Sequence, residues 1–213
     1  GIILLQIENL SKTYRLNDRD IEVLKNISFT AQPGEILGIV GKSGGGKSTL
    51  MKILRGMDRF DSGKITMDGI TITPDSSDEE IRARMAATAI HLQRDFALWT
   101  ESALNNVVRR IHSRKTGYEV LPIPENADYD EMYKEGLFYL GLVGLEKKAS
   151  HLATILSGGE KQRLVIARQL AKKPKVLLLD EPATMACPAT KQEVLDAIKN
   201  VRDKLGLTIV VVS

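Results

Sequence analysis

The chain has 213 residues, of which 43% are hydrophobic and 27% are charged, and its net charge at pH 7 is +3. These values are ordinary for a globular protein, and the small net charge gives little support to nucleic-acid binding. The single cysteine excludes an internal disulfide, and apolar runs such as ILGIV and TIVVV are too short to span a bilayer. We therefore expect a cytoplasmic protein that does not insert directly into a membrane.

The N-terminal region predicts two antiparallel strands and then a buried strand. Residues 2–8 and 21–30 have the composition of strands, and the polar stretch RLNDRD, residues 15–20, reads as the loop between them. The run ILGIV, residues 36–40, is continuously apolar, as is typical of strands that are buried on both faces. A glycine-rich loop follows this strand and leads into a predicted helix, STLMKILRGM.

Two local signals organise the next segment. In DSGKITMDGITI, the pair Asp68–Gly69 favours a tight turn and predicts that two strand segments meet there. Ser77 and Glu80 have the spacing of a helix capping box, which predicts a helix through EIRARM.

Residues 94–156 are predicted to form a helical lobe inserted into the rest of the domain. The stretches SALNNVVRRIHSRK and DYDEMYKEGLFYLGLVGL favour helices, and the proline-bearing GYEVLPIPENAD separates them. The core is then expected to comprise residues 1–93 and 157–213, in which helices alternate with the apolar strands KVLLLD and LTIVVVS. This alternation predicts an α/β fold with a mostly parallel sheet flanked by helices and an N-terminal antiparallel β subdomain.

The stretch GKSGGGKST matches the phosphate-binding pattern G-x-x-x-x-G-K-[ST] and lies between a predicted strand and a predicted helix. Its glycines let backbone N–H groups converge on phosphate oxygens, and the helix directs the positive end of its dipole at the anion. Lys47 is expected to neutralise the β- and γ-phosphates of ATP, and the Ser48 hydroxyl to bind Mg²⁺. The predicted ATP-binding residues of this loop are Gly41, Lys42, Ser43, Gly44, Gly45, Gly46, Lys47, Ser48 and Thr49.

Two adjacent carboxylates end the apolar strand VLLLD. Asp180 is suited to complete the Mg²⁺ site of a phosphate-loop protein, and Glu181 to polarise the attacking water as a general base. Together with Lys47, this pair predicts a P-loop NTPase core that hydrolyses ATP with Mg²⁺ as a cofactor.

The sequence LSGGEKQR, residues 156–163, narrows the class of NTPase. With the phosphate loop, HLQRDFALW, the helical lobe and VLLLDEP in this order, the chain resembles the ABC-type ATPase domain over essentially its whole length. The resemblance implies that nucleotide lies between two such domains, on the same chain or on different chains. It also implies that Ser157, Gly158 and Gly159 reach the γ-phosphate of the opposite domain across the interface.

Two further roles follow from the resemblance. Gln93 resembles the hinge glutamine that contacts Mg²⁺ or water during catalysis and couples the core to the helical lobe. Tyr14 occupies the place of the aromatic residue that stacks on adenine. The alternative for Tyr14 is a tyrosine that only packs at a strand end.

The chain departs from the family pattern in two places. Cys187, in ATMACP, stands where the family normally has an Asp, which places the family's route of communication between sites in doubt. We expect this residue to be a small, inert interface thiol rather than a metal ligand. The chain also stops at VVVS, before the histidine that contacts the γ-phosphate in the family. We therefore expect a C-terminal truncation that preserves ATP binding and can impair hydrolysis.

Three kinds of function are consistent with these motifs. The stretch QRDFALWTESALNNV resembles the region of transporter ATPases that contacts a membrane-spanning subunit, which favours a transport motor associated with the membrane through that partner. A soluble ATPase that activates a protein client is the second. Short segments, including EPATMACP, resemble the ATP-binding component of the methyl-coenzyme M reductase activation system of methanogens, which implies a second ATPase domain beyond residue 213. The third is an ATP-dependent clamp without hydrolysis, against which Asp180 and Glu181 argue.

Overall fold

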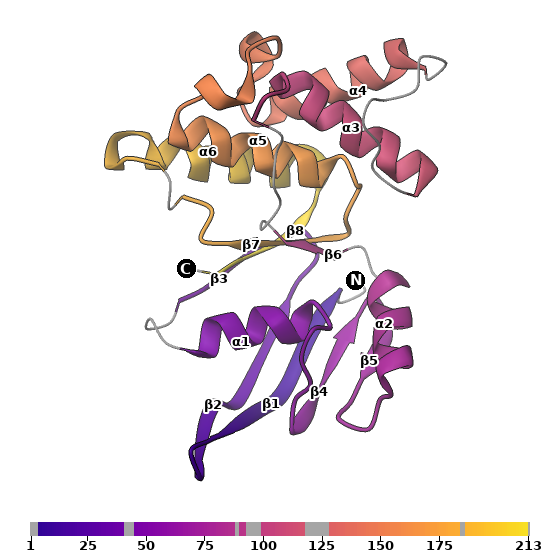
Figure 1. Cartoon of the computed structure of the whole chain (residues 1–213), viewed down its shortest axis with the longest axis vertical. Coiled ribbons are helices and arrows are strands. Elements are labelled where there is room, and N and C mark those ends of the chain that lie inside the picture. Colours follow the sequence, from indigo (N-terminus) through magenta and orange to yellow (C-terminus); the bar gives the residue numbers. More distant parts are fainter. Residues whose placement is uncertain are drawn as a thin grey trace. The chain divides into compact units, whose positions relative to one another are not determined.

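The computed structural model describes residues 4–40, 45–87, 90–92, 99–117, 128–183 and 186–212, and the chain divides into two compact units (Figure 1). Unit one comprises residues 1–90, 175–180 and 207–213, and unit two comprises residues 91–174 and 181–206. The predicted boundaries of the helical lobe remain a prediction. Unit two contains the helices of that lobe and two further helices, Gly158–Leu170 and Pro188–Leu205.

Unit one contains a four-stranded antiparallel sheet in the order β2-β1-β4-β5. Its strands are β1 (Leu5–Leu16), β2 (Arg19–Ala31), β4 (Ser62–Met67) and β5 (Ile70–Ile72). The buried side chains of this sheet are apolar and include Leu5, Ile7, Leu10, Ile65 and Met67, none of which exposes more than 1% of its surface. The predicted antiparallel β region is therefore confirmed.

The hairpin between β1 and β2 is tighter than the loop predicted for residues 15–20. Strand pairing continues as far as Leu16 and Arg19, so that only Asn17 and Asp18 form the turn. Both turn residues have positive φ, 50° and 60°, which Asn and Asp tolerate and which matches the twist of the flanking strands. The loop prediction is wrong because the polar residues of this segment belong to exposed strand ends.

The two local signals that follow in the sequence are confirmed. Asp68 and Gly69 form the turn between β4 and β5, with φ of 49° and 82°. Helix α2 (Asp78–Ala87) begins after the predicted capping box: the Glu80 N–H donates to Ser77 Oγ over 3.0 Å, and the Ser77 N–H donates to Glu80 Oε1 over 3.4 Å.

A second sheet has the strand order β3-β8-β7-β6. Its strands are β3 (Ile36–Ile39), β6 (Ile90–Leu92), β7 (Val176–Asp180) and β8 (Thr208–Val212). Both β3 and β7 pair with β8 in parallel, which confirms the predicted parallel sheet. Helix α1 (Gly45–Leu54) comes after β3 in the chain.

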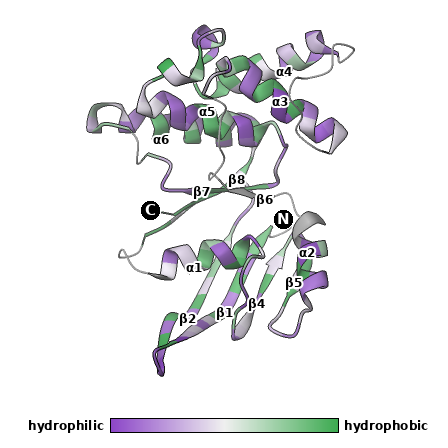
Figure 2. Ribbon diagram, viewed as in Figure 1, coloured by the Kyte–Doolittle hydropathy of each residue, from purple (hydrophilic) through white to green (hydrophobic). Residues whose placement is uncertain are grey.

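Apart from the end of β6, unit two is mainly helical in its described part. Its elements are α3 (Ala103–Thr116), α4 (Tyr129–Leu142), α5 (Gly158–Leu170), α6 (Pro188–Leu205) and the 3₁₀ helices η1 (Glu146–Lys148) and η2 (Ala153–Ile155). The two helices predicted for the lobe are confirmed as α3 and α4, whereas most of the predicted linker GYEVLPIPENAD lies outside the described residues. Figure 2 shows hydrophobic and hydrophilic stretches alternating along these helices. In the described part of the chain, no helix is both long and apolar enough to span a membrane.

An ion pair and its hydrogen bonds tie the helices of unit two together. Arg114 of α3 forms a bidentate ion pair with Glu135 of α4 and donates to the Ala171 carbonyl, 2.8 Å away, just after α5. The Tyr139 hydroxyl donates to the Glu135 carboxylate over 3.0 Å. Burial, together with the Glu135 charge, raises the pKa of Tyr139 to about 12, so this hydroxyl keeps its proton near neutral pH.

Candidate functional site

Helix α1 begins inside the predicted phosphate loop. A Cβ at Gly46 would lie 3.1 Å from the Val23 carbonyl oxygen of β2, so this close approach of two backbones favours glycine. Lys47 is half-buried and Ser48 is exposed, whereas Thr49 exposes only 4% of its surface. The other predicted loop residues, Gly41, Lys42, Ser43 and Gly44, lie outside the described residues.

Asp180 lies at the same edge of the second sheet as the carboxyl end of β3. In the strand register, Ile39 of β3 and Asp180 of β7 both pair with Val212 of β8. Because the strands are parallel, their carboxyl ends meet at one edge, and Ile39 and Asp180 are separated by two strand spacings, about 10 Å. The carboxyl end of β3, which precedes the phosphate loop in the sequence, and Asp180 therefore share this edge.

The predicted ligands Ser48 and Asp180 have the donor chemistry that a magnesium ion bound together with a nucleotide requires. Mg²⁺ prefers oxygen ligands and usually keeps several waters, so a hydroxyl and one carboxylate are enough protein ligands. Ser48, which is exposed, and Asp180, at the end of β7, carry these two groups, and their role as Mg²⁺ ligands remains a prediction. Gln93, the third predicted ligand, lies outside the described residues.

Glu181 follows Asp180 in a strained backbone conformation. Its φ is 48°, in the left-handed region that residues with a Cβ rarely adopt, and it is exposed to solvent. Such outliers cost on the order of 1–3 kcal/mol and cluster at active sites, where the strain is part of the mechanism. The role of Glu181 as a general base remains a prediction, which this conformation supports.

Tyr14, near the end of β1, is held by two neighbours in unit one, Asp58 and Lys12. Its hydroxyl donates to the Asp58 carboxylate. Lys12 Nζ lies 4.9 Å from the centre of the ring and 3.3 Å from Asp58 Oδ1. One face of the ring therefore carries a cation–π contact, and the hydroxyl is bonded to Asp58, in the turn that follows α1. The hydrogen bond to Asp58 raises the pKa of Tyr14 above its usual value.

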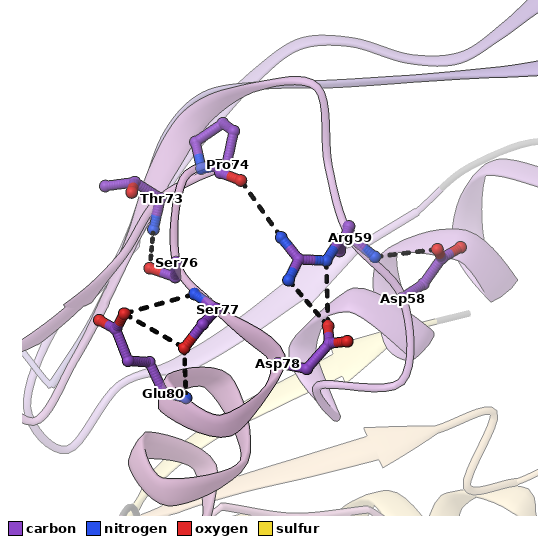
Figure 3. Close-up of polar contacts among 8 residues, drawn as sticks. All are labelled: Asp58, Arg59, Thr73, Pro74, Ser76, Ser77, Asp78 and Glu80. Atoms are coloured by element: carbon purple, nitrogen blue, oxygen red, sulfur yellow. Dashed lines mark hydrogen bonds and ion pairs between the residues drawn. The ribbon is translucent and has the colours of Figure 1, made fainter.

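Asp58 is linked through its neighbour Arg59 to the segment around the start of α2 (Figure 3). The Arg59 backbone N–H donates to Asp58 Oδ1 over 2.9 Å. The Arg59 guanidinium donates to Asp78 through two nitrogens, at 2.8 and 3.1 Å, and to the Pro74 carbonyl at 3.3 Å. The turn that carries Asp58 is thus linked to the first residue of α2. Through this network, Tyr14 has a defined orientation.

We predict that the Tyr14 ring stacks on adenine, and two variants separate this role from simple packing. Tyr14→Ala removes the ring and should weaken ATP binding by about 1–3 kcal/mol, the usual value of a base stacked on an aromatic side chain. Tyr14→Phe keeps the ring and should have a smaller effect, because only the hydrogen bond to Asp58 is lost. Titration calorimetry with ATP and with inorganic triphosphate measures the difference. Equal losses for the two ligands would show that Tyr14 only packs.

In unit two, helix α5 begins with a complete capping box formed by the predicted signature residue Ser157 and by Glu160. The Ser157 Oγ atom accepts the Glu160 backbone N–H over 3.2 Å, and the Glu160 carboxylate accepts the Ser157 N–H over 2.9 Å. The Ser157 hydroxyl uses a lone pair in this bond, so its proton is available to a further acceptor. With the helix dipole and the N–H groups of the first turn, this end of α5 suits an anionic ligand.

The start of α6 lies beside the start of α5. A Cβ added at Gly159 would lie 3.5 Å from Ala186 Cβ and 3.4 Å from Thr190 Oγ1, which is close contact distance. Cys187 is the N-cap residue of α6, but its side chain makes no capping hydrogen bond, and its Sγ lies 3.2 Å from Thr190 Oγ1. Hydrogen bonding with the Thr190 hydroxyl lowers the pKa of this exposed thiol.

Cys187→Asp should stabilise unit two, because Asp is a preferred N-cap residue and a carboxylate interacts favourably with the positive end of a helix. We expect a gain of about 1 kcal/mol in the free energy of unfolding relative to Cys187→Ala, measured by urea denaturation. The affinity of the monomer for ATP should be the same in both variants. An Asp variant that is no more stable than the Ala variant would contradict the N-cap assignment.

Comparison with known proteins places the chain in a family. Residues 24–184 match the family model described as ABC transporter. The chain belongs to the ABC transporter family. This ABC cassette is 49% identical over its whole length to the uncharacterized ABC transporter ATP-binding protein MJ1662 of Methanocaldococcus jannaschii, and it covers 36% of that protein. It is 38% identical to the phosphonates import ATP-binding protein PhnC of Bdellovibrio bacteriovorus, with 97% of this chain and 77% of that protein aligned.

Longer relatives and solved structures agree with this assignment. The methionine import ATP-binding protein MetN of Escherichia coli is 34% identical over 99% of this chain and 58% of its own length. The chain thus spans less than two thirds of MJ1662 and of MetN. A dimeric cassette, MJ0796, solved in a post-hydrolysis state with ADP and Pi, is 29% identical, with a TM-score of 0.73 over 99% of this chain and 88% of that one.

These findings confirm two predictions from the sequence. The resemblance to ABC-type ATPase domains is a family membership, and the α/β fold class with a P-loop NTPase core is shared with solved cassettes. As an ABC cassette, this domain is an ATPase that uses ATP with Mg²⁺.

Sequence reasoning missed the residues that hold the predicted site residues in place. Lys12 lies two positions before Tyr14 on the same strand, and strand periodicity is a signal that could have found it. Asp58 has no such signal, because 44 positions separate it from Tyr14. Glu160 does have a sequence signal, because it lies three residues after Ser157, which is the spacing of a capping box.

Proposed function

We propose that this ABC cassette hydrolyses ATP in a head-to-tail pair with a second cassette, and that the pair drives a transport partner. The observation that carries the proposal is the capping box at Ser157, which gives unit two an anion-binding helix end of its own. The phosphate loop and Asp180 belong to unit one. A nucleotide bound by one cassette alone has no need of two anion-binding helix ends, the start of α1 and the start of α5. In two cassettes placed head to tail, each nucleotide would contact the start of α1 from one cassette and the start of α5 from the other.

Each residue then has a defined task in the pair. Lys47 and the start of α1 bind the phosphates of ATP, and Ser48, Asp180 and Gln93 hold Mg²⁺, which neutralises charge on the phosphate oxygens when it is bound. Glu181 accepts the proton of the attacking water. From the opposite cassette, the Ser157 hydroxyl donates to the γ-phosphate, because its oxygen is already fixed by the Glu160 N–H.

The nature of the transport partner is inferred from the relatives. PhnC and MetN are import ATP-binding proteins by name, and they align with nearly the whole of this chain. We infer a membrane-spanning subunit as the partner. The cassette would then lie at the cytoplasmic face of a membrane and be held there by that subunit.

A second candidate is a soluble ATPase in which both cassettes lie in one polypeptide and activate a protein client. The observation that favours it is the alignment with only 36% of MJ1662, which leaves room in that relative for a second cassette. The sequence of the parent polypeptide distinguishes the candidates. A second phosphate loop would support the soluble ATPase, whereas neighbouring genes for membrane-spanning subunits would support the transport motor.

The test of pairing is the ATPase rate per chain, measured against protein concentration with Glu181→Gln as the blank. The rate per chain should rise with concentration, because each site needs a second cassette. A rate above the blank that does not depend on concentration would overturn the pairing. A rate equal to the blank at every concentration, with ATP still bound, would overturn the pairing of identical chains and favour a different second cassette.

A further inference from the structure

The first turn of α5 contains one acidic residue, Glu160. A negative charge at this position stabilises an empty helix through the dipole and the capping box. The same charge opposes the binding of a phosphate at that helix end, because like charges repel each other at short range. A helix end that caps itself with a carboxylate and also binds a γ-phosphate therefore needs a compensating cation.

Lys148 is in direct contact with this carboxylate. Its Nζ donates to Glu160 Oε2, while Glu160 Oε1 accepts the Ser157 N–H at 2.9 Å. The Glu160 side chain is 14% exposed and that of Lys148 is 42% exposed. Burial alone would raise the pKa of Glu160, but the hydrogen bonds from Lys148 and from the Ser157 N–H outweigh it, and the pKa lies below its usual value.

The backbone of Lys148 is fixed by the turn around η1. The Lys148 N–H donates to the Leu145 carbonyl over 2.9 Å, and the Lys148 carbonyl accepts the His151 N–H over 3.0 Å. Leu145 exposes only 1% of its surface, so this turn is anchored in the core of unit two. The ammonium group is therefore held next to Glu160 by an ordered segment rather than by a flexible loop.

The neighbouring cations of α5 are engaged elsewhere. Lys161 Nζ lies 5.4 Å from the centre of the Trp99 ring. Arg163 donates to the Val143 carbonyl over 2.8 Å and forms an ion pair of 3.6 Å with Glu193. Among these three cations, Lys148 is the one whose charge is directed at Glu160.

We propose that Lys148 is a positioning residue that neutralises Glu160, so that the Ser157 end of α5 can accept the γ-phosphate bound to a second cassette. The proposal rests on the proposed head-to-tail function. Lys148 itself does not touch the nucleotide. It acts through Glu160, which it keeps turned toward the Ser157 N–H and electrically paired. Its loss would leave an uncompensated negative charge at the helix end at the moment when ATP closes the pair.

The experiment measures ATP-driven dimerisation by sedimentation velocity in the Glu181→Gln background with Mg²⁺. Lys148→Met keeps the apolar stem without the charge, and Glu160→Gln keeps the capping acceptor without the charge. We expect Lys148→Met to weaken dimerisation on the order of tenfold. We expect Glu160→Gln to leave it equal or stronger, and the double variant to match Glu160→Gln. Lys148→Arg, which retains the charge, should dimerise like the parent.

Three outcomes would contradict the proposal, and they can be told apart. If Lys148→Met leaves dimerisation unchanged, the charge-compensation role alone is overturned. The same holds if Lys148→Met weakens dimerisation equally in the parent and in the Glu160→Gln variant. A parent that forms no ATP-driven dimer at any concentration would overturn the proposed pairing of identical chains, and this inference with it. Binding of ATP to the monomer should be the same in all variants, which confirms that each is folded.

Discussion

Replacing Lys47 with alanine should weaken ATP binding by about 2–3 kcal/mol, which is roughly 30- to 150-fold in the dissociation constant. The ammonium group is the counter-charge that we predict for the β- and γ-phosphates, and charge-assisted hydrogen bonds are the strongest kind. Alanine is a good helix former, and Gly46 still packs against β2, so α1 should remain intact. The loss should therefore reflect the missing charge and not a displaced helix.

Titration calorimetry with ATP and with AMP measures this effect. AMP lacks the β- and γ-phosphates, so the variant and the parent should bind it equally. Lys52→Ala is the matched control, because Lys52 lies on the same helix, is exposed and occupies the last turn. An ATP affinity that is the same in Lys47→Ala and Lys52→Ala would refute the assignment of Lys47 to the phosphates.

Glu181→Gln should lower the rate of ATP hydrolysis by about 100-fold or more while ATP binding is retained. General base catalysis contributes about 10²–10⁴-fold, and an amide cannot accept the proton of the attacking water at neutral pH. Glutamine has the same shape and the same backbone tolerance as glutamate, so the left-handed conformation at position 181 should persist. Because hydrolysis would no longer open the pair, ATP-bound dimers should accumulate.

Steady-state phosphate release and sedimentation velocity measure the two parts of this prediction. Glu79→Gln is the control for the loss of one negative charge, since Glu79 is exposed in the first turn of α2. Turnover in Glu181→Gln that equals turnover in Glu79→Gln would show that another group is the base. Full loss of ATP binding in Glu181→Gln would instead indicate that the substitution disturbs the site as a whole.

The helices and most strands could be predicted from the sequence because their signals are local. The Ser77–Glu80 capping box, the Asp68–Gly69 turn and the continuous apolar run of β7 depend only on near neighbours. The hairpin at Asn17 and Asp18 was misassigned for the same reason. A polar segment looks the same in a loop and at an exposed strand end, and only the pairing with the other strand distinguishes the two.

The candidate site could be predicted only as far as its motifs are contiguous. The phosphate loop, the Asp180–Glu181 pair and the Ser157 helix end each occupy a few successive residues. The residues that orient these motifs are not contiguous with them in the sequence. Asp58 contacts Tyr14, and Lys148 contacts Glu160, from other elements of the fold. Such contacts depend on the tertiary arrangement, which no spacing rule in a single sequence encodes.

Cys187 gives this cassette a ready attachment point for a spectroscopic probe. It is the single cysteine of the sequence, and its thiol is exposed. The lowered pKa of this thiol favours reaction with maleimide reagents, so it is more reactive than the inert thiol expected from the sequence. A fluorophore placed there would sit at the start of α6, beside Gly159, without any other cysteine to remove first. The approach of a second cassette to the Ser157 helix end could then be followed in real time as a change in emission.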